Sequence, residues 1–308
     1  MEITVIRGGM LTTVQDPGRV GYRAAGVALC GAMDPFALRM ANLLVGNAED
    51  AAAFECTLVG PELVFSADTV IAVCGAEFPG IPAWQPIAVR AGERIRLGVV
   101  SRGCRACLAV AGGIDVPPFL GSRSTYLRGQ VGGFQGRALR EGDVLAVPDV
   151  ARRVEEHWRI DPRILPEYSP ETVVRVVRGA QLEDFGGALF DAEFRIMHKS
   201  DRMGVRLGGA KLARIGGLPE MISAAVAPGT LQVPPDGQPI VLMADAQTIG
   251  GYPQAAHVVS VDLPLVAQLR PGDRVRFAEV PLDEAHRLIL AREHMFAILH
   301  EGLAQKLR

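Results

Sequence analysis

Short apolar runs separated by glycine and proline make up most of this chain. Valine, leucine, isoleucine and alanine recur in stretches of strand length, and 35 glycines and 21 prolines lie among them. This pattern is typical of a turn-rich β protein, because glycine and proline favour the backbone conformations that turns require. The first run, from Ile3 to Ile6, begins close to the N-terminus and predicts a strand there. We therefore expect an all-β fold class, mainly β with few helices.

Two segments carry helix signals instead. In the first, Asp34 can cap a helix and Pro35 fits its first turn, so the pattern predicts a helix that continues to about Val45. In the second, acidic residues near Asp283 precede an amphipathic stretch that runs towards Leu303. Helices are otherwise scarce.

Two recurring patterns favour related halves. The octapeptides 19–26 and 202–209 share the form R-x-G-x-R-x-x-G. A second pattern places a Gly-acid turn before a strand, as in Arg90-Ala-Gly-Glu93, Arg140-Glu-Gly-Asp143 and Arg270-Pro-Gly-Asp273. Together they favour a duplication in which the paired octapeptides occupy equivalent places.

A polar, proline-containing stretch indicates a domain boundary. It separates a strand that ends near Pro148 from a new strand that begins at Thr172. We predict a first unit over 1–150, a linker over 151–170, a second unit over 171–282 and a C-terminal helix over 283–308.

Composition and charge exclude several classes of protein. Apolar residue types make up 49% of the chain and charged types 21%, which favours a globular fold over disorder. The net charge of -2 provides no overall field that would attract nucleic acid or an anionic membrane. No apolar run approaches the roughly 20 residues of a membrane-spanning helix, and no secretory leader precedes the first strand. We therefore expect a cytoplasmic chain without nucleic-acid or membrane partners.

The five cysteines do not indicate disulfides or a metal site. Their number is odd, and a chain of 308 residues needs no disulfide staples. Cys104 and Cys107 form a lone C-x-x-C pair with no nearby histidine, which leaves a zinc site short of ligands. Because the residues from Cys107 onward are typical of a strand, the sequence favours core packing over a redox pair at a helix start.

Familiar catalytic signatures are missing from the sequence. It contains no G-x-x-x-x-G-K-[ST] loop, no H-E-x-x-H pair and no G-x-S-x-G elbow. Lys199 lies between His198 and Ser200, not in the Met-Lys-Met context of a biotinylated carrier. Any biotin must therefore be carried by another chain, and the candidate chemistry lies in polar, glycine-rich loops.

The loop 12–19 is the first of these candidates. Gln15, Asp16 and Arg19 lie beside a Pro-Gly turn, which can direct an amide, a carboxylate and a guanidinium into one cleft. The alternative is an Asx turn with an exposed arginine.

Two further segments combine glycine with charged residues. Gly31 to Asp34 leads into the first helix, where Asp34 as a cap would occupy the free N–H groups that an anion needs, so a structural role is favoured there. The long irregular segment 112–125 carries hydroxyl groups on both sides of Arg123. Such a loop commonly has a binding role, with either a partner protein or a substrate.

Glutamines gather around two glycine-rich turns, at 231–240 and 247–253. A primary amide such as that of Gln232, Gln238 or Gln247 donates and accepts at once, which suits the N–H and C=O edge of a lactam or urea. Buried glutamines can equally satisfy strand ends and turns. Their concentration favours a site.

With these motifs in hand, the chain resembles the family of 5-oxoprolinase C subunits, also called KipA-like, allophanate hydrolase subunit 2 or carboxyltransferase A/B. The resemblance extends from about Val5 to Phe277. The segments that carry it are Thr13-Val-Gln-Asp-Pro-Gly-Arg19, Gly31-Ala-Met-Asp34, Ala41-Asn42, Ala111-Gly-Gly-Ile-Asp115, Leu120-Gly-Ser-Arg-Ser-Thr125, Ser200-Asp-Arg-Met-Gly204, Gln232-Val-Pro-Pro-Asp-Gly-Gln-Pro239 and Gly250-Gly-Tyr-Pro253.

The resemblance implies two cyclophilin-like β-barrel units and part of a hydrolase that is active only as a complex. Its partners would be the B subunit, which is KipI-like, and the A subunit. The complex would use ATP, with Mg, to open the lactam of 5-oxoproline, a small cyclic amide, to glutamate. Alternatives are the carboxyltransferase component of a biotin-dependent urea or amide carboxylase, with biotin on another chain, or a KipA-like regulator of a KipI-like partner.

The loops together define the expected site, a cleft where Gln15, Asp16 and Arg19 approach the glutamine-bearing turns. The residues expected to be catalytic are Asp16, Arg19, Gln232 and Asp236. Those expected to bind substrate are Gln15, Asp34, Arg123, Arg202, Gln238, Gln247, Thr248, Gly250, Gly251 and Tyr252. No metal site within this chain is expected.

Overall fold

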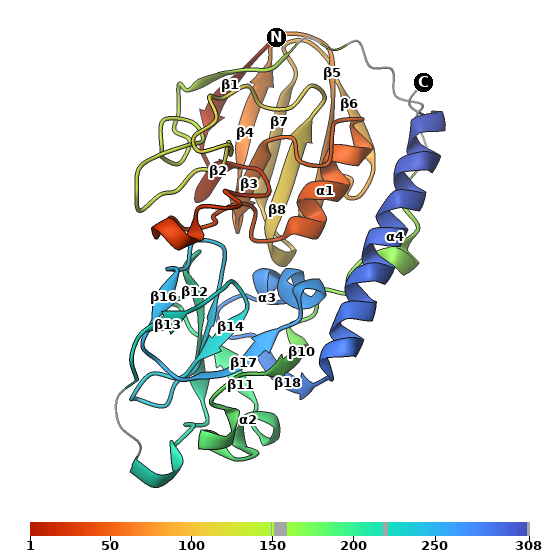
Figure 1. Cartoon of the computed structure of the whole chain (residues 1–308). Helices are drawn as coiled ribbons and strands as arrows, with labels where there is room; N and C mark the ends of the chain where they lie inside the picture. Colours follow the sequence, from red (N-terminus) through yellow and green to blue (C-terminus); the bar gives the residue numbers. More distant parts are fainter. Residues whose placement is uncertain (149, 151–158, 218–220, 307–308) are drawn as a thin grey trace. The chain divides into compact units, whose positions relative to one another are not determined.

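The chain is mainly β, as the sequence predicts. The structure, a computed structural model, describes residues 1–148, 150, 159–217 and 221–306. These residues form eighteen strands and four α-helices, together with short 3-10 helices (Figure 1). Two compact units are distinguished: unit 1 comprises 1–20, 30–166 and 296–308, and unit 2 comprises 21–29 and 167–295.

Unit 1 contains two antiparallel sheets. The four-stranded sheet has the order β7-β4-β1-β9, made of β1 (Glu2–Arg7), β4 (Val59–Phe65), β7 (Arg94–Val99) and β9 (Val144–Ala146). The five-stranded sheet has the order β2-β3-β8-β5-β6, made of β2 (Leu11–Gln15), β3 (Ala53–Thr57), β5 (Thr69–Glu77), β6 (Pro86–Val89) and β8 (Arg102–Val110). The predicted N-terminal strand is therefore confirmed as β1.

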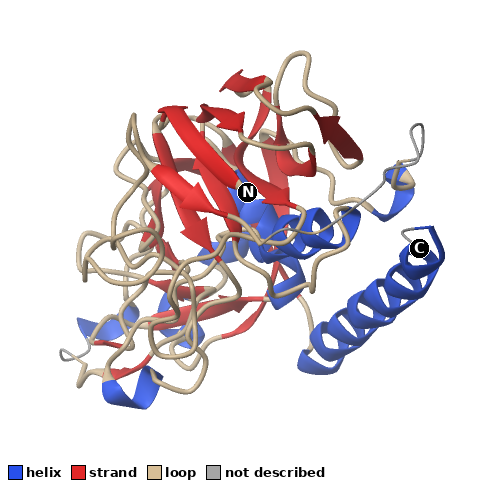
Figure 2. Cartoon of the chain, turned by 90° about the horizontal axis from the view of Figure 1, so that it is seen from above, coloured by secondary structure: helices blue, strands red, loops and turns tan. Residues whose placement is uncertain are grey.

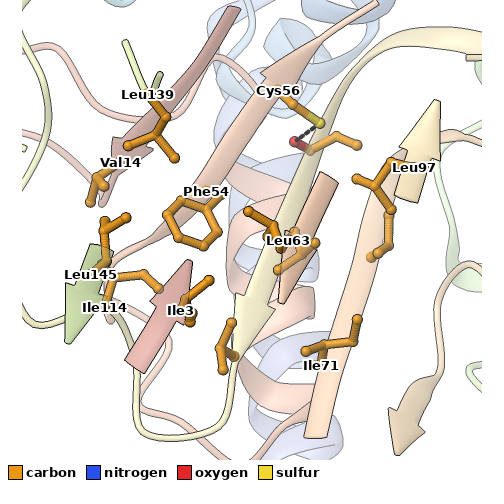
Figure 3. Packing of buried hydrophobic residues seen from close by; sticks show 14 of the residues in the cluster. Ile3, Val14, Phe54, Cys56, Leu63, Ile71, Leu97, Ile114, Leu139 and Leu145 are labelled. Carbon is orange, nitrogen blue, oxygen red and sulfur yellow. Dashed lines mark hydrogen bonds between the residues drawn. The ribbon is translucent and has the colours of Figure 1, made fainter. Parts of the chain in front are cut away.

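The inward-facing side chains of both sheets form one hydrophobic core. Ile3 on β1, Phe54 on β3, Leu63 on β4 and Ile71 on β5 are all fully buried and belong to the same cluster (Figure 3). Alternation along each strand produces this arrangement, because successive side chains of a strand point to opposite faces.

Helix α1 (Pro35–Leu44) packs against β5 and β8 and confirms the first predicted helix. Asp34 is its N-cap, since its carboxylate accepts a hydrogen bond of 2.9 Å from the backbone N–H of Ala37. Pro35 fills the first position, where no intrahelical N–H bond is lost.

Helix α4 (Leu282–Lys306) confirms the second predicted helix. Its first half contributes Ala285 to a cluster in unit 2 that includes Val259 and Val261. In unit 1, Phe296 is fully buried, with its ring 5.3 Å from that of Phe36. No helix among the described residues is both long and apolar enough to cross a membrane.

Unit 2 is built on a closed barrel of seven strands in the order β10-β17-β14-β15-β12-β11-β18. Their bounds are β10 (Glu171–Arg178), β11 (Phe194–Ile196), β12 (Gly204–Gly209), β14 (Thr230–Gln232), β15 (Ile240–Leu242), β17 (Gln254–Val258) and β18 (Arg274–Glu279). The parallel pair of β10 and β18 closes it. Beside it lie a two-stranded sheet of β13 (Ala224–Ala225) and β16 (Ile249–Gly250) and the short helices α2 (Ala188–Asp191) and α3 (Leu263–Gln268).

The three Gly-acid turns have the same geometry, as the sequence predicts. In each turn, the acid side chain accepts a hydrogen bond from the backbone N–H of the arginine three residues earlier. The distance is 2.9 Å for Glu93 and 2.7 Å for both Asp143 and Asp273. Their glycines have φ of 77°, 86° and 96°, which favours glycine. The strands that follow are β7, β9 and β18.

The matched octapeptides do not share a conformation, so the prediction that they occupy equivalent places is wrong at the level of local structure. Residues 204–209 form β12, whereas residues 23–25 form a 3-10 helix. The reason is the pattern of burial: Val205 and Leu207 alternate inward on β12, while Tyr22 and Ala24 are exposed.

The chain passes from unit 1 to unit 2 between Pro166 and Glu167, while residues 21–29 group with unit 2. Part of the predicted linker, 151–158, lies outside the described residues. The cyclophilin-like character of the two units stays a prediction. Between β8 and β9 the chain runs as a long irregular segment, described throughout, that contains the predicted loop 112–125. Loops and turns make up a large part of the chain (Figure 2).

All five cysteines are free and buried, and we expect them to resist alkylation in the folded protein. Burial raises the pKa of the Cys56 thiol to about 12 and raises that of Cys107 well above its usual value. Because the thiolate is the reactive form, these thiols should be unreactive at pH 8. Mass spectrometry after iodoacetamide treatment should show none modified in the native chain and five in the denatured chain. Rapid native modification of Cys104 or Cys107 would contradict this.

Phe54 anchors the core of unit 1, so Phe54→Ala should lower the free energy of unfolding by about 3–5 kcal/mol. The substitution removes apolar burial and leaves a cavity among close-packed neighbours. Val99→Ala is the control, since this side chain is 65% exposed and its loss should change stability by less than about 0.5 kcal/mol. Guanidinium denaturation followed by circular dichroism measures both; similar effects would show that the assigned core is wrong.

Candidate functional site

Asp16 joins two loops of unit 1. It follows β2 and is buried, and its Oδ1 accepts hydrogen bonds from the Gly18 N–H at 2.8 Å and the Ser122 hydroxyl at 2.7 Å. Ser124 also donates its hydroxyl to Oδ1, and the backbone N–H of Arg123 donates to Oδ2. A buried carboxylate is stable when its lone pairs are satisfied in this way. Asp16 therefore holds loop 15–19 against loop 122–125.

Arg19 is buried between these loops, and it forms no ion pair with any residue that the structure describes. Only 1% of it is exposed, and its Nη2 donates to the carbonyl oxygen of Ser124. Its Nε and Nη1 have no hydrogen-bond partner among the described residues, and its guanidinium carbon lies 5.5 Å from the centre of the Phe119 ring. Because a buried charge is costly unless it is paired, the two free donors of Arg19 are a candidate anion site.

A pair of glycines leaves the space that Arg19 occupies. A Cβ at Gly132 would overlap Nη2 of Arg19 and the carbonyl oxygen of Ser124, and one at Gly133 would overlap the Thr125 side chain. Both glycines also have positive φ, of 68° and 52°. Side chains at these positions are therefore excluded by both space and backbone conformation.

Gln15 extends the same site. Its Nε2 donates to the Thr13 hydroxyl at 2.9 Å and to the carbonyl oxygen of Thr125 at 3.2 Å, while its Oε1 is buried and has no partner among the described residues. The side chains of Gln15 and Arg19 thus bind the carbonyls of two consecutive residues, Thr125 and Ser124. One acceptor and two donors remain unused.

The other predicted residues of unit 1 have structural contacts. Asp34 is fully buried as the cap of α1, which supports the structural role that the sequence favours. Arg123 is exposed, and its Nε donates to the carbonyl oxygen of Val116 at 3.0 Å. Its backbone N–H donates to Asp16 and so helps to hold the two loops together.

Arg202 in unit 2 provides a contrast with Arg19, although both begin a matched octapeptide. Its Nε donates to Asp245 Oδ2 at 3.0 Å and its Nη2 to Oδ1 at 2.9 Å, and both side chains are 5% exposed. This is a bidentate buried ion pair. Arg202 therefore has an internal carboxylate partner where Arg19 has none.

The predicted glutamines of unit 2 bind one another and the backbone. Gln232 is buried, and its Nε2 donates to the carbonyl oxygen of Tyr252 at 3.3 Å. Gln247 donates through Nε2 to Gln232 Oε1 at 3.4 Å. Gly250 allows the Gln232 side chain to lie close to the backbone at position 250, because a Cβ there would lie 2.7 Å from Gln232 Nε2. The neighbouring Thr248 is also buried, and its carbonyl oxygen accepts the N–H of Val226 at 3.0 Å.

The loop 234–239 borders two surface hollows of unit 2. Asp236 and Tyr252 line both, one of about 850 Å³ that also includes Gly251 and one of about 810 Å³ that also includes Gln238. Asp236 Oδ1 accepts the N–H of Gln238 at 3.0 Å, which shapes the loop as an Asx turn.

The structure therefore groups the predicted residues within each unit. Gln15, Asp16, Arg19 and Arg123 meet in unit 1, whereas Gln232, Gln247 and Tyr252 meet in unit 2. The cleft predicted from both sets stays a prediction. Sequence reasoning missed the roles of Ser122, Ser124 and Gly132; the only signals were the hydroxyls beside Arg123 and a Gly-Gly doublet.

Comparison with known proteins agrees with the sequence resemblance. The family described as carboxyltransferase domain, subdomain A and B, matches residues 25–279. The 5-oxoprolinase C subunit of Escherichia coli K12 is 40% identical over 293 residues, which cover 92% of this chain and 93% of that protein. Urea amidolyase of Saccharomyces cerevisiae is 35% identical over 94% of this chain and 17% of its own length.

A solved structure supports the same relationship. The crystal structure of the K. lactis urea amidolyase matches with a TM-score of 0.90 and 33% identity, over 97% of this chain and 20% of that one. This chain thus spans about a fifth of the length of that urea amidolyase. The chain belongs to the family of carboxyltransferase domains with subdomains A and B. Within it, the chain is a homologue of the 5-oxoprolinase C subunit.

The contrast between the two buried arginines predicts opposite effects on stability. Arg202→Met should lower the free energy of unfolding by about 3–5 kcal/mol, because Asp245 would be left buried and unpaired. Arg19→Met removes a charge with no carboxylate partner, so the change should be within about 1 kcal/mol. Chemical denaturation of both variants measures the difference. Equal losses would show that Arg19 has a partner in the folded chain equivalent to Asp245.

Proposed function

We propose that this chain is the C subunit of an ATP-dependent 5-oxoprolinase, which opens the lactam of 5-oxoproline to glutamate together with the A and B subunits. Sequence identity supports this proposal, because it is 40% with the E. coli C subunit and 33–35% with the urea amidolyases. The observation that carries it is the pair of buried donors of Arg19, Nε and Nη1, that have no hydrogen-bond partner among the described residues, which fits a small anionic substrate.

The chemistry of 5-oxoproline matches the unused groups of the Arg19 site. Its carboxylate can accept a charge-assisted hydrogen bond from Nε or Nη1 of Arg19, the two nitrogens without a partner among the described residues. Its lactam N–H can be donated to Oε1 of Gln15, the buried acceptor that lacks a partner. The two ends of the substrate would then be oriented by neighbouring side chains of one loop.

Entry to this site requires a local movement. The free nitrogens of Arg19 are buried, and Phe119, which is 39% exposed, lies over the guanidinium. We propose that Phe119 moves aside when substrate binds. Loops commonly provide such access, since they have few of the contacts that hold a core in place.

Asp16 has a positioning role in this proposal. Its oxygens are occupied by the loop donors, so it holds the carbonyl of Ser124 beside Arg19 instead of acting as a free base. Gln232 and Asp236 of unit 2 remain candidates for catalysis, and Tyr252 and Gln238 for substrate binding. ATP with Mg would supply the free energy for lactam opening in the assembled enzyme.

A second candidate function is transfer of a carboxyl group from biotin to urea or a related amide. The TM-score of 0.90 with the K. lactis urea amidolyase favours it, as does the family description as a carboxyltransferase. In that case biotin would be carried by another chain. Urea has no carboxylate, so in this function the substrate that receives the carboxyl group would leave Nε and Nη1 of Arg19 without an anionic partner.

Reconstitution with the A and B subunits tests the main proposal. ATP-dependent release of glutamate from 5-oxoproline should require this chain, and Arg19→Ala should lower kcat/KM about tenfold to a hundredfold, since a charged hydrogen bond contributes about 1.5–3 kcal/mol. Arg163→Ala is the control, because this arginine is exposed and pairs with Asp161 nearby.

Full activity of Arg19→Ala would exclude the Arg19 site while leaving the assignment to 5-oxoprolinase intact. Glutamate release that does not depend on this chain would exclude the assignment itself. Biotin-dependent carboxylation of urea by a complex that contains this chain would support the second function.

A further inference from the structure

The outer face of the barrel in unit 2 carries a cluster of three cations that line one hollow. Arg195 on β11, Arg206 on β12 and Lys199 in the connection between these strands line the hollow of about 810 Å³. None of the three forms an ion pair with any residue in the described part of the chain. Asp236 is the acid that lines the same hollow, and it is engaged with the N–H of Gln238.

Strand register brings the two arginines close together. Arg195 lies opposite Gly208 in the antiparallel pair of β11 and β12, which makes Arg206 its diagonal neighbour. Diagonal neighbours on one face of a sheet are about 7–8 Å apart, so the two guanidinium groups can reach a common ligand. Like charges at this spacing repel each other unless an anion lies between them.

Other outward-facing arginines of the same barrel form ion pairs. On β18, Arg276 pairs with Glu193 at 2.9 Å, and on β10, Arg178 pairs with Glu279 at 2.6 Å and with Glu183 at 2.7 Å. Among the described residues, acids thus form ion pairs with the outward-facing arginines Arg178 of β10 and Arg276 of β18 but with neither arginine of the hollow. The excess of positive charge is therefore local to this hollow and is not shared by the paired arginines of β10 and β18.

The remaining lining suits a small molecule. The side chains of Met197 and Ile240 and the ring of Tyr252 supply an apolar wall, and Gly208 leaves room for Met197, whose sulfur a Cβ at that position would overlap. The volume lies in the range of small-ligand pockets, about 300–1,000 Å³. Guanidinium groups bind phosphate oxygens in pairs, and a lysine adds a third charge.

We propose that this hollow binds a small ligand that carries two linked phosphate groups. Arg195 and Arg206 would each bind one phosphate, and Lys199 would approach from the connection between the strands. Such phosphates can come from an inorganic pyrophosphate or from a nucleotide, whose base would lie against Tyr252. This site lies wholly within unit 2 and does not depend on the function proposed for Arg19.

Calorimetric titration of the full chain at constant ionic strength tests the proposal. Pyrophosphate and ADP should bind, and orthophosphate and citrate should bind at least about tenfold more weakly. Arg195→Gln and Arg206→Gln should each weaken pyrophosphate binding about tenfold, and the double variant should abolish it. Tighter binding of ADP than of pyrophosphate would identify a nucleotide as the source, and equal binding would identify the phosphates alone.

Arg178→Gln is the matched control, because it removes one positive charge from the same barrel but lies outside the hollow. It should change the affinity for pyrophosphate less than twofold. The proposal is overturned if wild-type protein binds neither pyrophosphate nor ADP, or if citrate binds as tightly as pyrophosphate. It is also overturned if the control loses as much affinity as the hollow variants, or if a folded double variant still binds.

Discussion

The candidate site depends on one buried carboxylate, that of Asp16. It binds hydroxyl and backbone donors from residues more than 100 positions later in the chain, so a single side chain joins two loops. Burying a carboxylate is unfavourable unless its lone pairs are occupied, and here they are. The same contacts fix the carbonyl of Ser124, which in turn holds one nitrogen of Arg19. The orientation of Arg19 is therefore a consequence of how Asp16 is satisfied.

Unit 1 and unit 2 each bury an arginine, and the two differ in what they leave unused. Arg202 is matched by Asp245 in a bidentate pair, which makes it part of the scaffold. Arg19 is matched by one carbonyl, which leaves two donors for a ligand. In the function proposed above, a ligand anion would take the place at Arg19 that Asp245 takes at Arg202. The exposed Arg195 and Arg206 also have no ion-pair partner among the described residues, and the ligand proposed for them is likewise an anion.

Much of the fold follows from local sequence. The cap at Asp34 with Pro35 at the next position predicts α1 correctly, because both act within one turn. The Gly-acid turns are also predicted correctly, since each needs only a positive φ at glycine and an acid that reaches back three residues. The octapeptides show the limit of this reasoning. Identical arginines and glycines in 19–26 and 202–209 adopt different structures. Both octapeptides have apolar residues at alternate positions, but only those of the second are buried in a sheet, whereas Val20 and Tyr22 are exposed.

The sequence by itself determined the β-rich class, both long helices and the family, and it singled out the loop that carries Asp16 and Arg19. Only the tertiary structure decided that Ser122 and Ser124 complete the Asp16 site, that Arg202 is paired, and that Arg195 and Arg206 share a hollow. The reason is physical. Caps and turns are set by neighbours within a few residues. The contacts of Asp16, Arg202, Arg195 and Arg206 instead depend on strand register and on loops that lie far apart in the sequence. No local pattern encodes which acid reaches which base.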